Sequence, residues 1–182
     1  AADAKNARLI WALGVISTLN LNRVVFTGGP GAGKTTVLDR LQELGYTVIP
    51  EVARQIIAER KSKGLSPRPS PVEFARAILE QDIQQYDGVS DELVFFDRSI
   101  LDALGMLRNC GELSDGELEE YLARFPYYSP VFVFPPWAEI YRTDSERDQS
   151  FEESKHVYAS INAWHLECGY DVSMVALGTV DE

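Results

Sequence analysis

The sequence is poor in the residues that build metal clusters and disulfide frameworks. It contains two cysteines and two histidines among 182 residues. Cys110 and Cys168 lie far apart in the chain, and His156 and His165 belong to no HExxH or His/Cys motif. These spacings match no zinc site. We therefore expect no metal at these side chains, and two reduced thiols in a cytoplasmic protein.

Positive charge is also scarce. The chain carries 17 lysines and arginines against 28 aspartates and glutamates, which gives a formal net charge of -11. Such a surface repels phosphate backbones and anionic lipids, which argues against a general nucleic-acid-binding or membrane-binding protein. Any phosphate that the protein binds must therefore meet a local positive site.

The sequence lacks a hydrophobic run that could span a membrane. The apolar run at residues 9–16, LIWALGVI, is too short to cross a bilayer, and no small-residue cleavage pattern follows it. We interpret residues 1–20 as an N-terminal extension, in which a short amphipathic helix docks on the domain or on a second copy. Residues 21–182 fit one α/β domain, because a chain of this size buries about 70% of the surface that it exposes when unfolded.

Apolar strands alternate with helical segments from residue 23 onward. We expect strands at residues 23–27, 46–50, 92–97, 131–134 and 171–177. Helices are expected at residues 34–44, 52–63, 71–86 and 101–109, from a cap at Ser114 to Arg124, and in a segment that ends at Gly169. This alternation predicts a single doubly wound α/β domain, with a five-stranded parallel sheet, helices on both faces and ligands outside the carboxyl ends of the strands.

The loop between the first strand and the first helix, GGPGAGKTT, matches the phosphate-loop pattern GxxxxGK(S/T) in the required strand–loop–helix context. Glycines let successive backbone N–H groups point at the phosphates of ATP or, alternatively, GTP, and the helix N-terminus adds partial positive charge. Lys34 is expected to reach the β- and γ-phosphates, and the Thr35 hydroxyl to bind Mg²⁺. The predicted nucleotide-binding residues are Gly28, Gly29, Pro30, Gly31, Ala32, Gly33, Lys34, Thr35 and Thr36.

Two residues at the end of the third predicted strand indicate how the phosphates are used. Asp97 ends an apolar strand, where P-loop proteins carry the acid that holds Mg²⁺ or its water shell; capping of the next helix is the alternative. Arg98 follows, where many P-loop ATPases carry a glutamate that polarises water, so transfer to a bound acceptor is favoured over hydrolysis. No NKxD-like motif follows the fourth or fifth strand, which argues against a signalling GTPase.

Glu51 follows the second predicted strand and should emerge at the same sheet edge as the phosphate loop, with Arg54 one helical turn later. A carboxylate there can orient an acceptor hydroxyl or accept its proton, while Arg54 binds an anionic part of the acceptor. The alternative is a first-turn glutamate that is favoured by the helix dipole and paired with Arg54. Arg68, Trp137 and Tyr141 are further candidates for lining an acceptor pocket.

A polar segment at residues 137–150, WAEIYRTDSERDQS, follows the fourth strand and contains Arg142 and Arg147. In phosphoryl transfer, one inserted arginine can raise the rate by ~10³ or more. We interpret the segment as a mobile lid that closes over the nucleotide. A solvated, mixed-charge surface loop is the alternative.

The order of the phosphate loop, PEVAR at residues 50–54, FFDRS at residues 95–99 and an arginine-bearing lid resembles a compact P-loop kinase-like family. This family is often labelled AAA-type ATPases and includes the ribosylnicotinamide kinase domain of the NadR proteins; nucleoside and nucleoside-monophosphate kinases are more distantly similar. The resemblance runs from about residue 21 to the C-terminus. It implies a base at Glu51, metal or phosphate contacts at Asp97, Arg98 and Ser99, and lid arginines at Arg142 and Arg147. A second Walker-type acid and a sensor arginine module are missing, so ring-forming AAA mechanics are not expected.

We therefore expect a cytoplasmic P-loop enzyme that binds Mg·ATP and transfers the γ-phosphoryl group to a small hydroxyl-bearing acceptor. A nucleoside is one compound of this kind. The residues predicted to carry catalysis are Lys34, Glu51, Asp97, Arg98, Arg142 and Arg147, with Thr35 and Asp97 at the metal and Glu51, Arg54 and Arg98 at the acceptor. A rival hypothesis is a nucleotide-switched binding protein with slow ATP or GTP turnover, whose partner binds the helical arm between Arg54 and Tyr86.

Overall fold

The computed structural model describes residues 22–89, 92–141 and 150–178, and within these ranges it contains the predicted alternation. The strands are β1 (Arg23–Gly28), β2 (Thr47–Ile49), β3 (Val94–Asp97), β4 (Val131–Phe134) and β5 (Val172–Met174). The helices are α2 (Lys34–Glu43), α3 (Val52–Ser62), α4 (Pro71–Gly88), α5 (Ile100–Asn109), α6 (Asp115–Arg124) and α7 (Phe151–Glu167). The fifth strand is shorter than the predicted residues 171–177, because β4, its neighbour in the sheet, is itself short.

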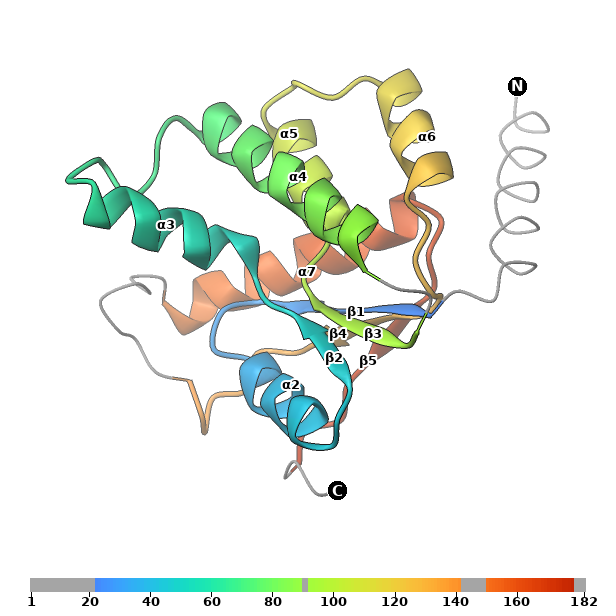
Figure 1. Ribbon diagram of the computed structural model, residues 1–182. Helices are drawn as coiled ribbons and strands as arrows, with labels where there is room; N and C mark the ends of the chain where they lie inside the picture. Colours follow the sequence, from blue (N-terminus) through green and yellow to red (C-terminus); the bar gives the residue numbers. More distant parts are fainter. Residues whose placement is uncertain (1–21, 90–91, 142–149, 179–182) are drawn as a thin grey trace.

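The strands form one parallel sheet in the order β2-β3-β1-β4-β5 (Figure 1). The central strand β1 pairs with β3 on one side and with β4 on the other. The register places Asp97, the last residue of β3, beside Phe26, and Phe134, the last residue of β4, beside Gly28. The carboxyl ends of these strands therefore meet at one edge of the sheet, where the predicted site residues follow them.

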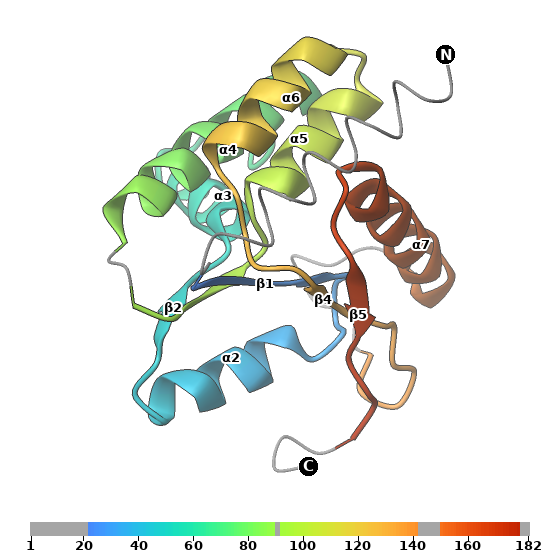
Figure 2. The ribbon, with the colours of Figure 1, turned by 90° about the vertical axis from the view of Figure 1, so that its right-hand side faces the viewer.

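Helices cover both faces of the sheet, as predicted, but unevenly. Figure 2 shows α2 on one side of the sheet and α3, α4, α5, α6 and α7 on the other. Because side chains alternate between the two faces along a strand, Val25 joins the larger core under α3 to α7, whereas Val24 and Phe26 pack with Leu38 of α2. Burial on both faces explains why β1 reads as a continuous apolar run.

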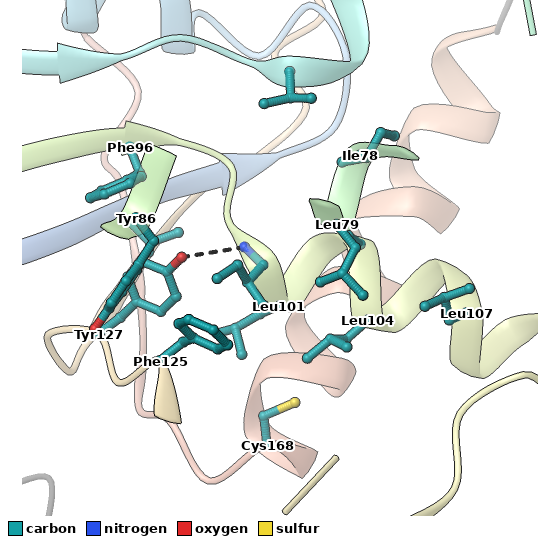
Figure 3. Packing of buried hydrophobic residues seen from close by; sticks show 14 of the residues in the cluster. Ile78, Leu79, Tyr86, Phe96, Leu101, Leu104, Leu107, Phe125, Tyr127 and Cys168 are labelled. Atoms are coloured by element: carbon teal, nitrogen blue, oxygen red, sulfur yellow. Dashed lines mark hydrogen bonds between the residues drawn. The ribbon is translucent and has the colours of Figure 1, made fainter. Parts of the chain in front are cut away.

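The larger core fixes the start of α5, the helix that follows Arg98 and Ser99. Tyr127 is fully buried, and its hydroxyl oxygen accepts a hydrogen bond from the Ile100 backbone N–H at 3.4 Å (Figure 3). Leu101, the next residue of α5, is buried in the same hydrophobic cluster as Tyr127 (Figure 3). These contacts hold the first turn of α5, and therefore the two residues before it, in a defined position.

Helix α7 packs closely against α5. A Cβ atom at Gly105 would lie 2.9 Å from Cδ1 of Trp164, so only glycine permits this approach. The indole Nε1 of Trp164 donates a hydrogen bond to the Leu101 carbonyl at 2.7 Å. These two helices form adjoining walls of the cavity described below.

The predicted helix caps are present. Ser70 with Glu73, and Ser114 with Glu117, form reciprocal capping boxes at the starts of α4 and α6. None of the described helices combines the length and the apolar character that a bilayer span requires.

Candidate active site at the carboxyl edge of the sheet

The loop after β1 depends on glycine at both ends. Gly28 has φ 139°, and a Cβ atom there would lie 2.5 Å from the Phe134 carbonyl oxygen of β4. Gly33, the N-cap of α2, has φ 84° and provides no side-chain cap. The first N–H groups of α2 are therefore left open to an anion, as the phosphate-loop motif predicts.

Lys34 is buried at the start of α2, with 7% of its surface exposed. Its Nζ donates to the carbonyl oxygens of Gly28 and Gly29 at 3.4 and 3.3 Å. Burial and the nearby Arg98 lower the pKa of Lys34 to about 8, although Asp97 and other carboxylates oppose the shift. The ammonium is thus held on its own loop by long hydrogen bonds that phosphate oxygens can replace with stronger ones.

Asp97 has the features of a metal ligand. Its Oδ1 atom is buried without a hydrogen-bond partner, and burial raises the pKa of its carboxyl despite the opposing effect of Lys34. The capping alternative is not what is observed, because Asp102 makes the capping-box contact with Ser99 at the start of α5. Thr35, the other predicted ligand, is exposed on the first turn of α2.

This donor set fits Mg²⁺. Among the described residues no cluster of three or more His, Cys, Asp or Glu side chains could enclose a metal ion. Magnesium beside a nucleotide takes most of its ligands from phosphates and water and needs only one or two protein oxygens. An unpartnered carboxylate oxygen at Asp97 and a hydroxyl at Thr35 supply that number.

Arg98 joins the separate parts of the site. Its Nε donates to Oε1 of Glu51 at 2.9 Å, its Nη1 to Oδ1 of Asp102 at 3.3 Å, and its Nη2 to the Gly28 carbonyl at 3.1 Å. Its backbone has φ 69°, a region that residues with side chains rarely adopt. Burial disfavours the charge, but Glu51 and Asp102 outweigh burial and raise the pKa of Arg98. The guanidinium is therefore a permanent, oriented positive charge beside the phosphate loop.

Glu51 is the N-cap residue of α3, and both of its oxygens are engaged. Oε1 accepts from Arg98, and Oε2 accepts from Nε of Arg54 at 3.1 Å. Burial tends to raise the pKa of Glu51, but Arg98, Lys34 and Arg54 together lower it. The local Glu51–Arg54 pair that the sequence offered as the alternative is present, and the contact with Arg98 also joins the same carboxylate to the phosphate-loop region.

Asp102, on the first turn of α5, was not predicted from the sequence. Its Oδ1 accepts from the Thr27 hydroxyl at 2.6 Å and from Arg98, while Oδ2 accepts from the Ser99 backbone N–H at 3.0 Å. It is the second carboxylate, besides that of Glu51, to bind the Arg98 guanidinium. The S-x-x-D spacing of a capping box was the available signal in the sequence, but it indicates only a helix start.

A cavity of about 800 Å³ opens from the phosphate loop between α3, α4, α5 and α7, and Lys34, Glu51 and Arg98 are among its lining residues. Its other walls are largely apolar; they include Phe74, Ile78, Met106, Ile161 and Trp164. Arg54 and Arg68, two of the candidates for an acceptor pocket, line this cavity and are exposed. Trp137 and Tyr141, the other two candidates for an acceptor pocket, are not among the residues that line this cavity, and the Tyr141 ring packs against Phe151 with 5.4 Å between ring centroids.

The cavity also contains Asp82 of α4, a second residue that the sequence did not single out. Its Oδ2 atom is buried without a hydrogen-bond partner. A lone aspartate within a helix has no motif around it, so sequence reasoning had no signal to find it.

The predicted lid arginines, Arg142 and Arg147, lie outside the described residues. The described residues on either side of this segment border the phosphate loop. A Cβ atom at Gly33 would lie 3.2 Å from Cδ1 of Ile140, and one at Gly29 would lie 3.2 Å from the Ser154 carbonyl oxygen. The lid therefore remains a prediction.

Residues 23–182 match the model of a family described as AAA domain. A search of the curated proteins found no significant match. Several solved structures share the fold at low identity. A deoxyadenosine kinase from M. mycoides with bound dATP is 13% identical with a TM-score of 0.55, and the match covers 86% of this chain and 92% of the kinase.

Two further structures match with the same TM-score. YorR from Bacillus subtilis, in complex with phosphorylated GDP, is 13% identical with a TM-score of 0.55, and the match covers 88% of this chain and 90% of YorR. NadR in complex with NR is 19% identical with a TM-score of 0.55, and the match covers 84% of this chain but 43% of NadR. At identities of 13% to 19%, these matches establish the fold of this chain and nothing beyond the fold.

Proposed function

The chain belongs to the AAA domain family, and we propose that it is a P-loop kinase that transfers the γ-phosphoryl group of Mg·ATP to a small hydroxyl-bearing acceptor. The acceptor occupies the cavity beside the phosphate loop, and a nucleoside is the class that we favour. The fold shared with a deoxyadenosine kinase supports this class. ATP is the proposed donor, and GTP is tested beside it.

The observation that carries the proposal is the Glu51–Arg98 pair between the phosphate loop and the cavity. A cavity of about 800 Å³ falls within the range of small-molecule sites, and here it is continuous with the lysine of the phosphate loop. A nucleotide-switched binding protein needs no such cavity at the γ-phosphate. The geometry therefore favours transfer to an acceptor over the switch hypothesis.

The nucleotide side is proposed to use Lys34, Thr35 and Asp97. Lys34 exchanges its carbonyl contacts for the β- and γ-phosphates, while the N–H groups at the start of α2 hold phosphate oxygens. Thr35 and Asp97 would hold Mg²⁺, which neutralises charge on the phosphates. Arg98 adds a fixed positive charge near the γ-phosphate.

Glu51 is proposed to position the acceptor hydroxyl and to receive its proton late in the reaction. Its lowered pKa makes it a carboxylate at neutral pH but a weak base. A weak base suffices, because phosphoryl transfer proceeds through a loose transition state in which the attacking oxygen needs little early deprotonation. The two arginine contacts aim the carboxylate without consuming every lone pair.

The proposal is tested by measuring ADP formation with purified protein, Mg·ATP and a library of hydroxyl-bearing metabolites that includes nucleosides, with GTP in parallel. Lys34→Ala serves as the inactive control. Acceptor-dependent ADP formation that the control lacks supports the kinase. Nucleotide-dependent binding of a protein partner, with turnover that no acceptor changes, would instead support the switch hypothesis and end the kinase proposal.

A further inference from the structure

Asp82 lies on α4 and lines the same cavity as Glu51 and Arg98. Its Oδ2 atom is buried and has no hydrogen-bond partner. Burying a polar atom without a partner costs on the order of 1–3 kcal/mol, so such an atom is uncommon unless something outside the folded chain completes it. Its place in the wall of a cavity indicates where that partner would come from.

The groups around Asp82 do not satisfy it. Asp102 of α5 and Glu51 at the start of α3 disfavour its charge, and Arg98 favours it. Arg98 is already shared between Glu51, Asp102 and the Gly28 carbonyl. Burial and the two neighbouring carboxylates raise the pKa of Asp82 to about 8, so the empty site keeps this carboxyl largely protonated near neutral pH.

This environment selects the chemistry of a ligand. A phosphate or carboxylate group next to Asp82 would be repelled by three acidic side chains, those of Asp82, Asp102 and Glu51. An apolar group would leave the buried oxygen of Asp82 without a hydrogen bond. A neutral carboxyl could also donate its O–H to an acceptor on the ligand, but the lone pair of that acceptor would face the negative charges of Glu51 and Asp102. A nitrogen that donates a hydrogen bond satisfies the unpartnered oxygen and gains from the same negative charge. The apolar side chains of Phe74, Ile78 and Trp164 line the same cavity and suit a ring that carries such a nitrogen.

We propose that the acceptor carries an N–H donor, such as an amino group on a heterocycle, that binds the Asp82 carboxyl while its hydroxyl faces Glu51. This inference rests on the proposed kinase function and narrows its substrate class to nitrogen-bearing hydroxyl compounds. Asp82 is then a specificity-determining residue in the wall of the cavity that also contains Glu51 and Arg98.

The test uses nucleoside pairs that differ by one amino group: adenosine with purine riboside, and cytidine with pyrimidin-2-one riboside. The ratio of kcat/KM values within each pair is measured for the wild type, Asp82→Leu and Asp82→Asn, with Asp87→Asn on the exposed side of α4 as a matched control. The wild type should prefer an amino-bearing member by on the order of 10-fold or more. Asp82→Leu should abolish the preference, Asp82→Asn should reduce it, and Asp87→Asn should keep it.

The outcomes separate this inference from the kinase proposal. Equal turnover within the pairs, or a preference that survives in Asp82→Leu, overturns the role of Asp82 and leaves the kinase intact. A preferred acceptor from the wider library that lacks any N–H group also overturns the role of Asp82. A preferred acceptor that carries an N–H group is compared with its analogue lacking that group, in the wild type and the same variants. If no compound stimulates ADP formation, the kinase proposal fails and this inference fails with it.

Discussion

The guanidinium of Arg98 donates to the carboxylate of Glu51 across 2.9 Å, although 47 residues separate them in the chain. The same guanidinium reaches the Gly28 carbonyl of the phosphate loop at 3.1 Å. One arginine therefore connects the carboxylate proposed to face the acceptor with the loop proposed to hold the nucleotide. The position of Glu51 is tied to that of the phosphate loop.

Replacing Glu51 by glutamine should slow transfer and spare nucleotide binding. The glutamine amide keeps an oxygen that can accept from Arg98. It lacks the carboxylate that is proposed to orient the acceptor hydroxyl and to accept its proton. We expect kcat to fall by roughly 10² to 10⁴, with the affinity for Mg·ATP changed less than ~10-fold. Steady-state kinetics and calorimetric titration measure the two effects, and Glu59→Gln, on the exposed side of α3, should behave as wild type. Normal transfer combined with lost nucleotide affinity would move Glu51 to the nucleotide side.

Asp97→Asn should produce a different defect. Removing the charge weakens the proposed magnesium ligand, so every ATP-dependent activity should fall, including slow hydrolysis without an acceptor. The concentration of Mg²⁺ needed for half-maximal activity should rise. A titration with Mg²⁺ at fixed ATP measures it. An unchanged magnesium requirement together with normal turnover would remove Asp97 from the metal site.

Binding of Mg·ATP should weaken as the pH rises past about 8. In the empty protein Lys34 has a pKa of about 8, and phosphate oxygens favour its charged form, so binding takes up a proton when Lys34 is neutral. Calorimetry from pH 7 to pH 9 should show falling affinity and proton uptake. Lys34→Ala should bind far more weakly and lose this pH dependence. Equal affinity in the variant would refute the phosphate-loop assignment.

Asp82→Asn should stabilise the empty protein, most clearly at alkaline pH. Its pKa of about 8 in the folded protein lies above the ordinary value of 3.8, so between about pH 4 and 8 unfolding releases a proton and stability falls as the pH rises. The neighbours that share this environment are Asp102, Glu51, Arg98 and Tyr127.

Urea unfolding at pH 5 and pH 8 measures this effect. Asparagine does not titrate, so the variant loses the pH dependence that Asp82 gives to the free energy of unfolding, which is at most about 1.4 kcal/mol per pH unit. The gain of Asp82→Asn over the wild type should therefore be larger at pH 8 than at pH 5, while Asp87→Asn, on the exposed surface, shows no such difference. A variant that is less stable than the wild type at both pH values would show that the carboxyl has a stabilising partner.

The lid prediction concerns Arg142 and Arg147, and Ile140 before their segment and Ser154 after it border the phosphate loop. An arginine that engages the γ-phosphate as charge shifts stabilises the transition state more than bound ATP. Arg142→Ala or Arg147→Ala should lower kcat by ~10² or more, with nucleotide affinity changed less than ~10-fold. Proteolysis between residues 141 and 150 should slow when ATP and an acceptor analogue are both present. Normal turnover in both variants, with ligand-independent cleavage, would indicate an ordinary surface loop.

The sequence by itself determined the local features of this protein. The phosphate loop, the capping boxes at Ser70 and Ser114 and the alternation of apolar strands with helices are encoded within a few neighbouring residues, so their patterns can be recognised without the fold. The sequence also predicted that Glu51 and Asp97 lie at one edge of the sheet, because parallel strands that alternate with helices have their carboxyl ends on the same side.

Only the tertiary structure decided which of these residues meet. The order β2-β3-β1-β4-β5 places β3 between β2 and β1, so Arg98 reaches both Glu51 and the loop at Gly28, a relation that spacing along the chain does not specify. Asp102 and Asp82 were missed for the same reason: Asp102 gains its role from Thr27 of β1 and from Arg98, and Asp82 gains its role from a cavity lined by other helices. Periodicity and motifs report contacts within one element, whereas charge pairing and an unpartnered carboxyl in a cavity arise from packing between elements distant in sequence.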